Sequence, residues 1–464
     1  MKHTERLGTE KISKLIIRMS IPAIIAMIVQ ALYNVVDSIF VASISEKALT
    51  ALSLAFPIQM VIISIFIGLG IGLNSVISRR LGEGNKDEAV NTAEHGFLLG
   101  LILWALIAVA AIFLPRWFFS LFTDDPVIID YATQYTTIIM IFSFGRIFAQ
   151  VCMSIMQATG DMVSSMKIGL TGAISNIILD PILIFGVLFI PALGVKGAAI
   201  ATVTGQTISM VVAFILMFKN EKGLKLNLRK FHFDGRITKN IFKVGFPAML
   251  MQGLASIMLA GVNFILAGFG ATPIAVFGAF FKLQSFIFMP VFGLCQGMMP
   301  IVGFNFGAKN KKRVIDAVKF GALISFCIMS FGLIIFQAFP ATLLSLFSSS
   351  AEMTQIGITA FRIISIGFPI AGVCIVLSVS FQALGDAHLS LIISFARQIL
   401  VLLPVAFALS LALNEVGVWI AFPIAEVSCL ILIILFAIRT YRRKIKHLGE
   451  TENEPLTTES LPAS

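Results

Sequence analysis

Residues 15–41 read LIIRMSIPAIIAMIVQALYNVVDSIFV, a run that is almost wholly apolar. A helix that crosses a membrane needs about 20 such residues, so this run is long enough to span once. Barrel strands would be shorter and would alternate in polarity. Eleven further segments of the same kind follow, at 51–77, 93–114, 132–158, 165–189, 193–218, 240–268, 272–302, 316–339, 354–381, 388–412 and 416–438. We therefore predict an all-α membrane protein with twelve transmembrane helices.

The composition excludes a soluble enzyme. Hydrophobic residues make up 58% of the 464 residues and charged residues only 12%, which is more apolar surface than one soluble core could hide. The chain has no P-loop and no HExxH or GxSxG motif, so we expect no enzyme activity and no cofactor. The cysteines all lie in apolar runs without a CxxC pair, and we expect small buried residues rather than a disulfide framework or a zinc site. They are Cys152, Cys295, Cys327, Cys374 and Cys429.

The lysines and arginines predict the orientation. With a cytoplasmic N-terminus, 27 of the 34 fall in inside segments, three in outside loops and four within spans. This bias follows the positive-inside rule and explains the net charge of +10 as a coat beside anionic lipid, without nucleic-acid binding. We predict a multi-pass protein of the cell (inner) membrane with both termini in the cytoplasm.

The chain repeats itself at an offset near 225 residues. Ser20 to Ala23 matches Gly245 to Ala248, and Gln157 to Asp161 matches Gln382 to Asp386. Two halves that both start inside form a parallel repeat, with a substrate site expected between them near the midplane. We predict two pseudo-symmetric six-helix lobes. Their ranges are 1–218 for the N-lobe, 219–239 for a cytoplasmic linker, 240–446 for the C-lobe and 447–464 for a disordered tail.

Polar side chains within the spans are costly, and those that remain usually face a cavity or a partner. The first span carries Gln30, Tyr33, Asn34 and Asp37, whose spacing places them on one helical stripe. For Gln30 and Asn34, simple helix–helix contact is an equal interpretation. For Asp37 we favour a functional role, because an acid is a poor residue for holding helices together.

The fifth and sixth spans carry a second polar group. Asn176 and Asp180 share a helix face just before Pro181, and Thr202 and Gln206 form a stripe on the next span. Two carboxylates, an amide and a hydroxyl could hold a small hard cation or a proton, and the alternative is a static hydrogen-bonded network. Lys282 either lines the cavity or pairs with an acid. No role is assigned to three further charged residues in the spans: Arg146, Arg397 and Glu426.

These motifs resemble the MATE (multidrug and toxic compound extrusion) transporters. The resemblance rests on Pro22 with the run Tyr33 to Ala42, on Gln157 to Asp161, on Asn176 to Pro181 and on Gly197 to Thr202, and it extends from about residue 10 to 445. It implies two six-helix lobes of the MATE/MOP fold. It also implies export of organic, often cationic, drugs and toxic compounds in exchange for H⁺ or Na⁺, with membrane lipid as the other partner.

Carried over position by position, the resemblance implies a cation site, for H⁺ or Na⁺, of Asp37, Asn176, Asp180 and Thr202 with Tyr33 beside it. Pro22 would be the bending point of the first helix. The stretch 252–256 has no acid, which resembles the DinF-like branch of the family. Asn263 lies opposite Asp37 in the repeat and is neutral, so the lobes are chemically asymmetric.

Two other functions remain open at this stage. A flippase or exporter of a lipid-linked or metabolite substrate would share the lobes, although flippases usually add helices or a strongly cationic cavity. A receptor or scaffold is the third interpretation, and two intact repeats with buried acids argue against it. We expect a monomer.

Overall fold

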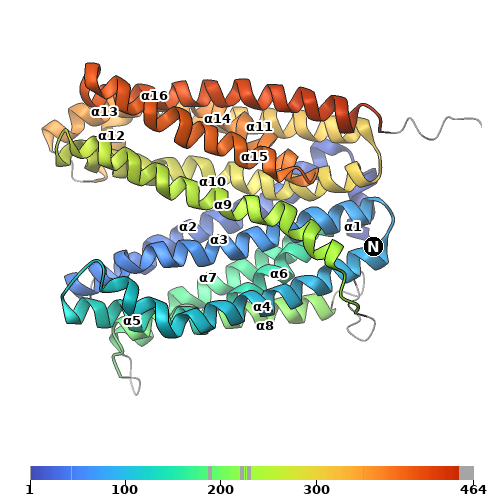
Figure 1. The fold of residues 1–464 in the computed structure, drawn as a ribbon, viewed down its shortest axis with the longest axis horizontal. Coiled ribbons are helices and arrows are strands. Elements are labelled where there is room, and N and C mark those ends of the chain that lie inside the picture. The colour runs from blue at the N-terminus through green and yellow to red at the C-terminus, as the bar shows by residue number, and fades with distance from the viewer. Residues whose placement is uncertain are drawn as a thin grey trace, which may run out of the picture.

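The chain is almost entirely helical in its computed structural model, which describes residues 2–42, 44–186, 191–219, 224, 226, 231–347 and 350–448. The side chains of residues 2, 34, 35, 37–39, 41 and 42 are outside this description. The N-terminal half contains α1 (Lys2–Thr9), α2 (Ile12–Ala42), α3 (Glu46–Gly82), α4 (Lys86–Phe119), α5 (Pro126–Ile141), α6 (Phe144–Ala158), α7 (Met162–Phe185) and α8 (Val195–Lys219) (Figure 1).

The C-terminal half repeats this series. It contains α9 (Gly235–Ala267), α10 (Ala271–Gly307), α11 (Lys311–Ala338), α12 (Pro340–Ser345), α13 (Ala351–Ser365), α14 (Phe368–Ala383), α15 (Ala387–Phe395), the π-helical turn η2 (Ala396–Leu402), α16 (Leu403–Thr440) and the π-helical turn η3 (Tyr441–Ile445).

The twelve predicted spans can be found among these helices. Nine described helical segments are long and apolar enough to cross a membrane, and two bent helix pairs raise the number to 11. One of the nine, Ala387–Ile445, has 59 residues, or about 90 Å at 1.5 Å per residue, which is far more than one membrane crossing. Its backbone turns at Asn414, where φ is 52° and ψ is −141°. Counting the two arms separately gives twelve.

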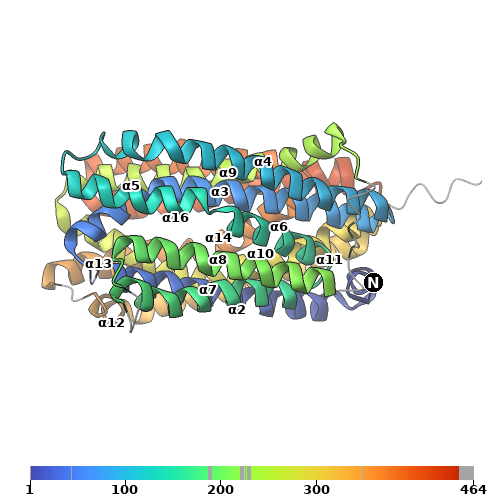
Figure 2. The ribbon, with the colours of Figure 1, turned by 90° about the horizontal axis from the view of Figure 1, so that it is seen from below.

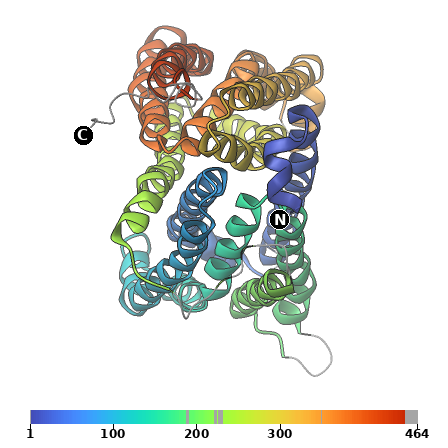
Figure 3. The same cartoon turned by 90° about the vertical axis from the view of Figure 1, so that its right-hand side faces the viewer.

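The helices form two bundles that lie side by side. Seen from the end where the N-terminus lies, the blue-to-green helices make one group and the yellow-to-red helices the other, with the N-terminal segment at their junction (Figure 3). The long axes of most helices run along the molecule from this end to the other (Figure 2). By the positive-inside count, the end with the N-terminus is the predicted cytoplasmic end.

Glycines bring the two bundles into close contact near this end. A Cβ on Gly293 of α10 would lie 2.7 Å from the Cα of Ile24 in α2, and one on Gly297 would lie 2.8 Å from the backbone nitrogen of Ser20. Gly68 and Gly72 of α3 meet Gly245 and Ile241 of α9 in the same way. The glycines of the run 68–72 therefore allow close helix packing.

The repeat is also visible in the turns. Asn85 and Asn310 each cap the following helix by accepting a bond from the backbone N–H three residues on, at 3.1 Å and 3.2 Å. The residue before each cap has a left-handed backbone, which Gly84 adopts at φ 78° and Lys309 at φ 55°. Glycine carries no penalty there, whereas a lysine does.

Two spans that the sequence predicts as single helices are bent. The predicted segment 132–158 is α5 followed by α6, with a 44° bend, and the segment 354–381 is α13 followed by α14, with a 46° bend. Pro369 lies in the first turn of α14 and explains one break, because a proline is accommodated in a first turn. The other break has no proline, and nothing in the local sequence explains it.

Candidate functional site

A buried polar group joins α7 to α8 in the N-terminal half. The amide nitrogen Nδ2 of Asn176 lies 3.3 Å from Oδ1 of Asp180 and 3.3 Å from Oγ1 of Thr202. Asp180 is completely buried, and Asn176 and Thr202 expose only 3% and 8% of their surface. Three of the four residues of the predicted cation site therefore lie together, away from water.

Close packing of two helices makes this contact possible. A Cβ on Gly205, one turn after Thr202, would lie 3.2 Å from the backbone nitrogen of Asn176 and 3.0 Å from the carbonyl oxygen of Gly172. One turn further along α8, the Ser209 hydroxyl donates to the carbonyl oxygen of Ile168 at 2.7 Å. A bulkier residue at 205 would push α8 away and take Thr202 out of reach of Asn176.

The donor atoms of this group suit a small hard cation or a proton. The carboxylate of Asp180, the hydroxyl of Thr202 and the carbonyl oxygen of Asn176 are all oxygens, which hard cations prefer. Oδ1 of Asn176 is buried and has no hydrogen-bond donor among the described side chains. Because the O and N of an amide exchange places by a half-turn, this oxygen could face a bound ion.

For the other predicted site residues, the structure gives the helix and the burial of some and leaves the side chains of two outside its description. Pro22 is buried inside α2, and Gln30 and Tyr33 are half-buried further along the same helix, each with an interaction partner. The side chains of Asn34 and Asp37 lie outside the described residues, so their part in the site stays a prediction. Three more predicted residues are described: Gln206 is half-buried in α8, Asn263 is half-buried in α9, and Lys282 is exposed on α10.

A second charged group, which spacing in the sequence did not reveal, lies in the C-terminal half. Nη1 of Arg397, in the π-helical turn η2, is 2.6 Å from Oε1 of Glu426 in α16. The sulfur atoms of Cys374 and Cys429 and a carboxylate oxygen of Glu426 lie within 4.8 Å of one another. The expectation that every cysteine is buried is wrong for Cys327, which is exposed on α11.

The motifs at 157–161 and 382–386, which match in the internal repeat, have structural roles. Asp161 caps α7 by accepting from the backbone N–H and the hydroxyl of Ser164, at 3.1 Å and 2.8 Å. Asp386, its counterpart, is paired with Lys444 at 2.7 Å. The Ser75 hydroxyl donates to the carbonyl oxygen of Gln382 at 2.7 Å and so ties α3 to α14 across the two bundles.

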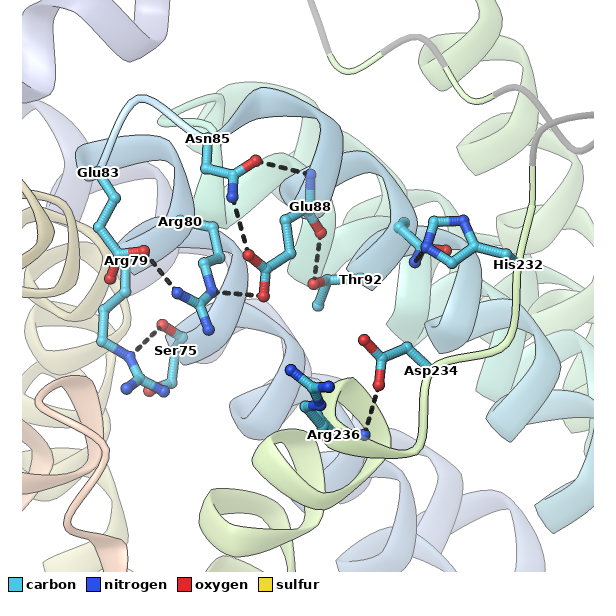
Figure 4. Close-up of polar contacts among 11 residues, drawn as sticks. Ser75, Arg79, Arg80, Glu83, Asn85, Glu88, Thr92, His232, Asp234 and Arg236 are labelled. Carbon is cyan, nitrogen blue, oxygen red and sulfur yellow. Dashed lines mark hydrogen bonds and ion pairs between the residues drawn. The ribbon is translucent and has the colours of Figure 1, made fainter.

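Figure 4 shows the polar contacts that fix the turn between α3 and α4 at the predicted cytoplasmic end. Arg80 contacts Glu83 at 2.6 Å and Glu88 at 2.9 Å, and Asn85 donates to Glu88 at 2.9 Å. Arg79 lies beside Gly385 of the other half, where an added Cβ would be 2.6 Å from its Nη1. This turn is therefore held by several polar contacts and touches both bundles.

A buried histidine holds the start of the C-terminal half against α4. Nδ1 of His95 lies 2.8 Å from the carbonyl oxygen of Asn91, to which it must donate, and Nε2 accepts from the backbone N–H of Asp234 at 2.9 Å. The rings of Phe231 and Phe233 lie 5.0 Å and 5.5 Å from the imidazole ring. This contact was missed in the sequence because His95 sits in an otherwise apolar span.

Comparison with known proteins identifies the family. The profile of the MatE family matches residues 22–182 and 247–408, one stretch in each half. The chain belongs to the MatE family. The two matched stretches correspond to the two repeats that the sequence and the turns show, so the fold prediction of two six-helix lobes is confirmed.

Relatives within the MatE family carry several names. A protein of Shewanella oneidensis called a FAD transporter is 28% identical over 440 residues, which is 92% of this chain and 94% of that protein. The multidrug export protein MepA of Staphylococcus haemolyticus is 26% identical over 432 residues, again 92% and 94% of the two chains. The probable multidrug resistance protein NorM of Thermotoga maritima is 27% identical and covers 88% of this chain and 89% of its own.

Solved structures of MatE-type transporters match closely. An outward-facing MATE transporter of the MOP superfamily superposes with a TM-score of 0.89 at 29% identity, covering 97% of this chain and 99% of its own. A MOP superfamily transporter of Pyrococcus furiosus, described as having a binding pocket of reversed polarity, gives the same score at 28% identity with the same coverage. The chain is a multi-pass membrane transporter of this family, and its relatives support drug export.

Proposed function

We propose that this transporter exports organic compounds, often cations, across the cell membrane in exchange for H⁺ or Na⁺ by alternating access. The buried group of Asn176, Asp180 and Thr202 carries this proposal, because an acid kept in a membrane-spanning helix needs a use that outweighs its cost. The names of the staphylococcal and Thermotoga relatives support drugs as substrates.

The proposed exchange depends on whether the two acids, Asp37 and Asp180, are charged or are neutralised by a bound proton or cation. An ion or proton that enters from outside neutralises this pair, the first helix repacks, and substrate leaves the space between the lobes. The close contacts at the predicted cytoplasmic end, such as Gly293 against Ile24, fit a state that is closed inward. For the exchange to do work, substrate and ion must favour opposite states.

Vesicle transport tests the proposal. Purified protein in proteoliposomes is given a fluorescent organic cation with a pH gradient alone or a sodium gradient alone. We expect Asp37→Asn and Asp180→Asn to abolish export driven by the effective gradient while elution on size exclusion stays unchanged. The matched control is Asp130→Asn, which alters an exposed aspartate bonded to Gln134. Full gradient-driven export by both site variants would reject the coupling role.

Thr202→Val separates the two coupling ions. The change keeps the side-chain shape but removes one oxygen that lies 3.3 Å from Asn176. If sodium is bound, we expect its half-saturating concentration to rise about tenfold or more, as disturbed metal sites show. If protons couple, the carboxylates of Asp37 and Asp180 carry the proton, and Thr202→Val should leave the pH profile nearly unchanged.

Export of an anionic metabolite is the second candidate. Lys282 of α10 and Arg146 of α6 both lie within spans and form no ion pair in the described part of the chain, so a negatively charged substrate could meet them. The name of the Shewanella relative points the same way. Competition by flavin adenine dinucleotide in the same vesicles tests this, and Lys282→Gln should then weaken flavin export without weakening cation export.

A further inference from the structure

A groove at the predicted cytoplasmic end lies between the first and ninth spans. It has a volume of about 600 Å³ and is open to the surface. One wall comes from the start of α2 in the N-terminal half and the other from α11 in the C-terminal half, so the groove touches both bundles. Its lining consists of Lys11, Ile12, Ser13, Lys312, Arg313, Asp316, Lys319, Phe320 and Leu323.

The groove carries four cations and one acid. Lys11, Lys312 and Lys319 are exposed, and no ion pair of theirs occurs in the described part of the chain. Asp316 is also exposed, and it is the one lining residue that disfavours an anion. The net charge of the lining is therefore +3, at the level where α2 and α11 enter the membrane.

Arg313 is built into the floor of the groove. Its Nε donates to Oδ1 of Asn305 at 2.8 Å, and its Nη2 donates to the carbonyl oxygens of Leu7 at 3.0 Å and Glu10 at 2.8 Å. These bonds join α11 to the junction of α1 and α2. The two N–H groups of Nη1 make no hydrogen bond with any described residue and remain available to a ligand.

The polarity of the groove changes along α11. Lys312, Asp316, Lys319 and Leu323 share one exposed face, with 58% of Leu323 exposed. From the first to the last of these the helix rises about 16 Å, which carries the face from the headgroup level into the acyl-chain region. A ligand that fits both ends has a charged head and a long apolar tail.

We propose that this groove binds one anionic phospholipid of the inner leaflet and that the bound lipid holds the two lobes together at this end. The phosphate lies among the lysines and Nη1 of Arg313, and an acyl chain lies over Phe320 and Leu323. Basic pockets between spans on the cytoplasmic side are suited to such headgroups. A zwitterionic lipid gains less, because its ammonium group meets the cations and has only Asp316 to contact.

The position of the groove gives the lipid a conformational effect. Lys11 and Lys312 belong to different lobes, so separating the lobes at this end takes the headgroup contacts apart. A ligand shifts an equilibrium only by its different affinity for the two states. Bound anionic lipid therefore favours the state that is closed at the predicted cytoplasmic end, whatever the transported substrate is.

The test uses the full chain in nanodiscs of phosphatidylcholine alone or with phosphatidylglycerol. Native mass spectrometry measures retained lipid, and hydrogen exchange measures protection of residues 2–19 and 311–323. The triple variant K11Q/K312Q/K319Q is compared with the control K219Q/K239Q/K243Q, which removes the same charge from exposed lysines near the linker. Each lysine beside an anionic surface contributes about five-fold in affinity, so the triple variant should lose at least tenfold.

We expect phosphatidylglycerol to bind and to protect both segments in the wild type and in the control, and the triple variant to lose both effects. Asp316→Asn should raise the affinity above that of the wild type. Equal binding of phosphatidylglycerol and phosphatidylcholine, or full binding by the triple variant, overturns the proposal. Equal protection by phosphatidylethanolamine rejects an anionic headgroup, and equal protection by free inorganic phosphate rejects a lipid.

Discussion

Removing one member of the Arg397–Glu426 pair should destabilise the transporter far more than removing both. The two side chains expose 27% and 15% of their surface, and their charged atoms are 2.6 Å apart. Oε2 of Glu426 is buried and accepts no hydrogen bond in the described part of the chain. Arg397 is therefore the one described group seen to compensate this acid in its apolar surroundings.

The magnitude follows from the cost of leaving one charge behind. Breaking a fully buried pair costs about 3–5 kcal/mol, and the 15% exposure of the Glu426 side chain that is left behind places Arg397→Leu near the lower end, roughly 3 kcal/mol. Glu426→Leu should cost roughly 2 kcal/mol, because a long arginine can reach more polar surroundings. The double leucine variant should lose only about 1 kcal/mol, since two apolar residues replace the pair.

Reversible unfolding in mixed micelles of dodecyl maltoside and SDS gives the free energy of unfolding of the wild type, the two single leucine variants and the double variant. The double-mutant cycle then yields a coupling energy of roughly 4 kcal/mol. Glu426→Gln is the conservative control, because its amide oxygen can still accept from Arg397 and should restore part of the loss. Additive effects of the two single leucine variants would show that the pair contributes no coupling and would refute the reasoning.

Three further predictions concern the turns and the lobe contact. Lys309→Gly should raise the free energy of unfolding by about 0.5–1 kcal/mol, because the left-handed backbone at φ 55° suits glycine; micelle unfolding measures it. Gly293→Leu should increase hydrogen exchange at the inner ends of α2 and α10 at least tenfold, because its side chain would overlap Ile24, and unchanged exchange would contradict this. The hydrogen bond from Lys47 and the helix cap lower the pKa of Asp125, so this contact is lost only as the pH falls below the ordinary range of an aspartate. Asp125→Asn should therefore leave the pH dependence of transport between pH 5 and 8 unchanged in the vesicle assay.

The spans could be predicted because the bilayer imposes one dominant constraint on sequence. An apolar run such as 416–438 has no alternative to a membrane helix, and the repeat then fixes how the helices group. The bend between α5 and α6 could not be predicted, because no proline marks it and nothing else in the local sequence explains it. The same holds for the π-helical turn η2, which carries Arg397 and interrupts what reads as a regular helix.

The candidate site was predictable only where its members share a helix. Asn176 and Asp180 are four residues apart, so their shared face follows from helix geometry alone. Thr202 joins them because Gly205 lets α8 approach α7, which depends on the crossing of two helices. Arg397 and Glu426 are separated by 29 residues and a chain reversal, and no spacing rule connects them.

The repeat explains why the two lobes differ chemically. Gly194 and Asn414 occupy the same left-handed position before α8 and within α16, which sets a local offset of 220 residues. Thr202 then corresponds to Phe422, and Gln206 corresponds to Glu426. The oxygen that Thr202 supplies in the N-terminal lobe is thus replaced by the apolar ring of Phe422. The acid of the C-terminal lobe, Glu426, lies one helical turn after Phe422, on the side of the predicted cytoplasmic end.

This difference favours the N-terminal lobe as the place where charge is exchanged. A proton or sodium ion that bound Glu426 would have to compete with the guanidinium of Arg397 at 2.6 Å. At Asp180 the contact from Asn176 is a neutral amide at 3.3 Å, which can turn its oxygen toward an arriving cation without moving a charge. Under the proposed exchange, we therefore expect the ion pair of the C-terminal lobe to stay closed and the gradient to act on the lobe that contains Asp180.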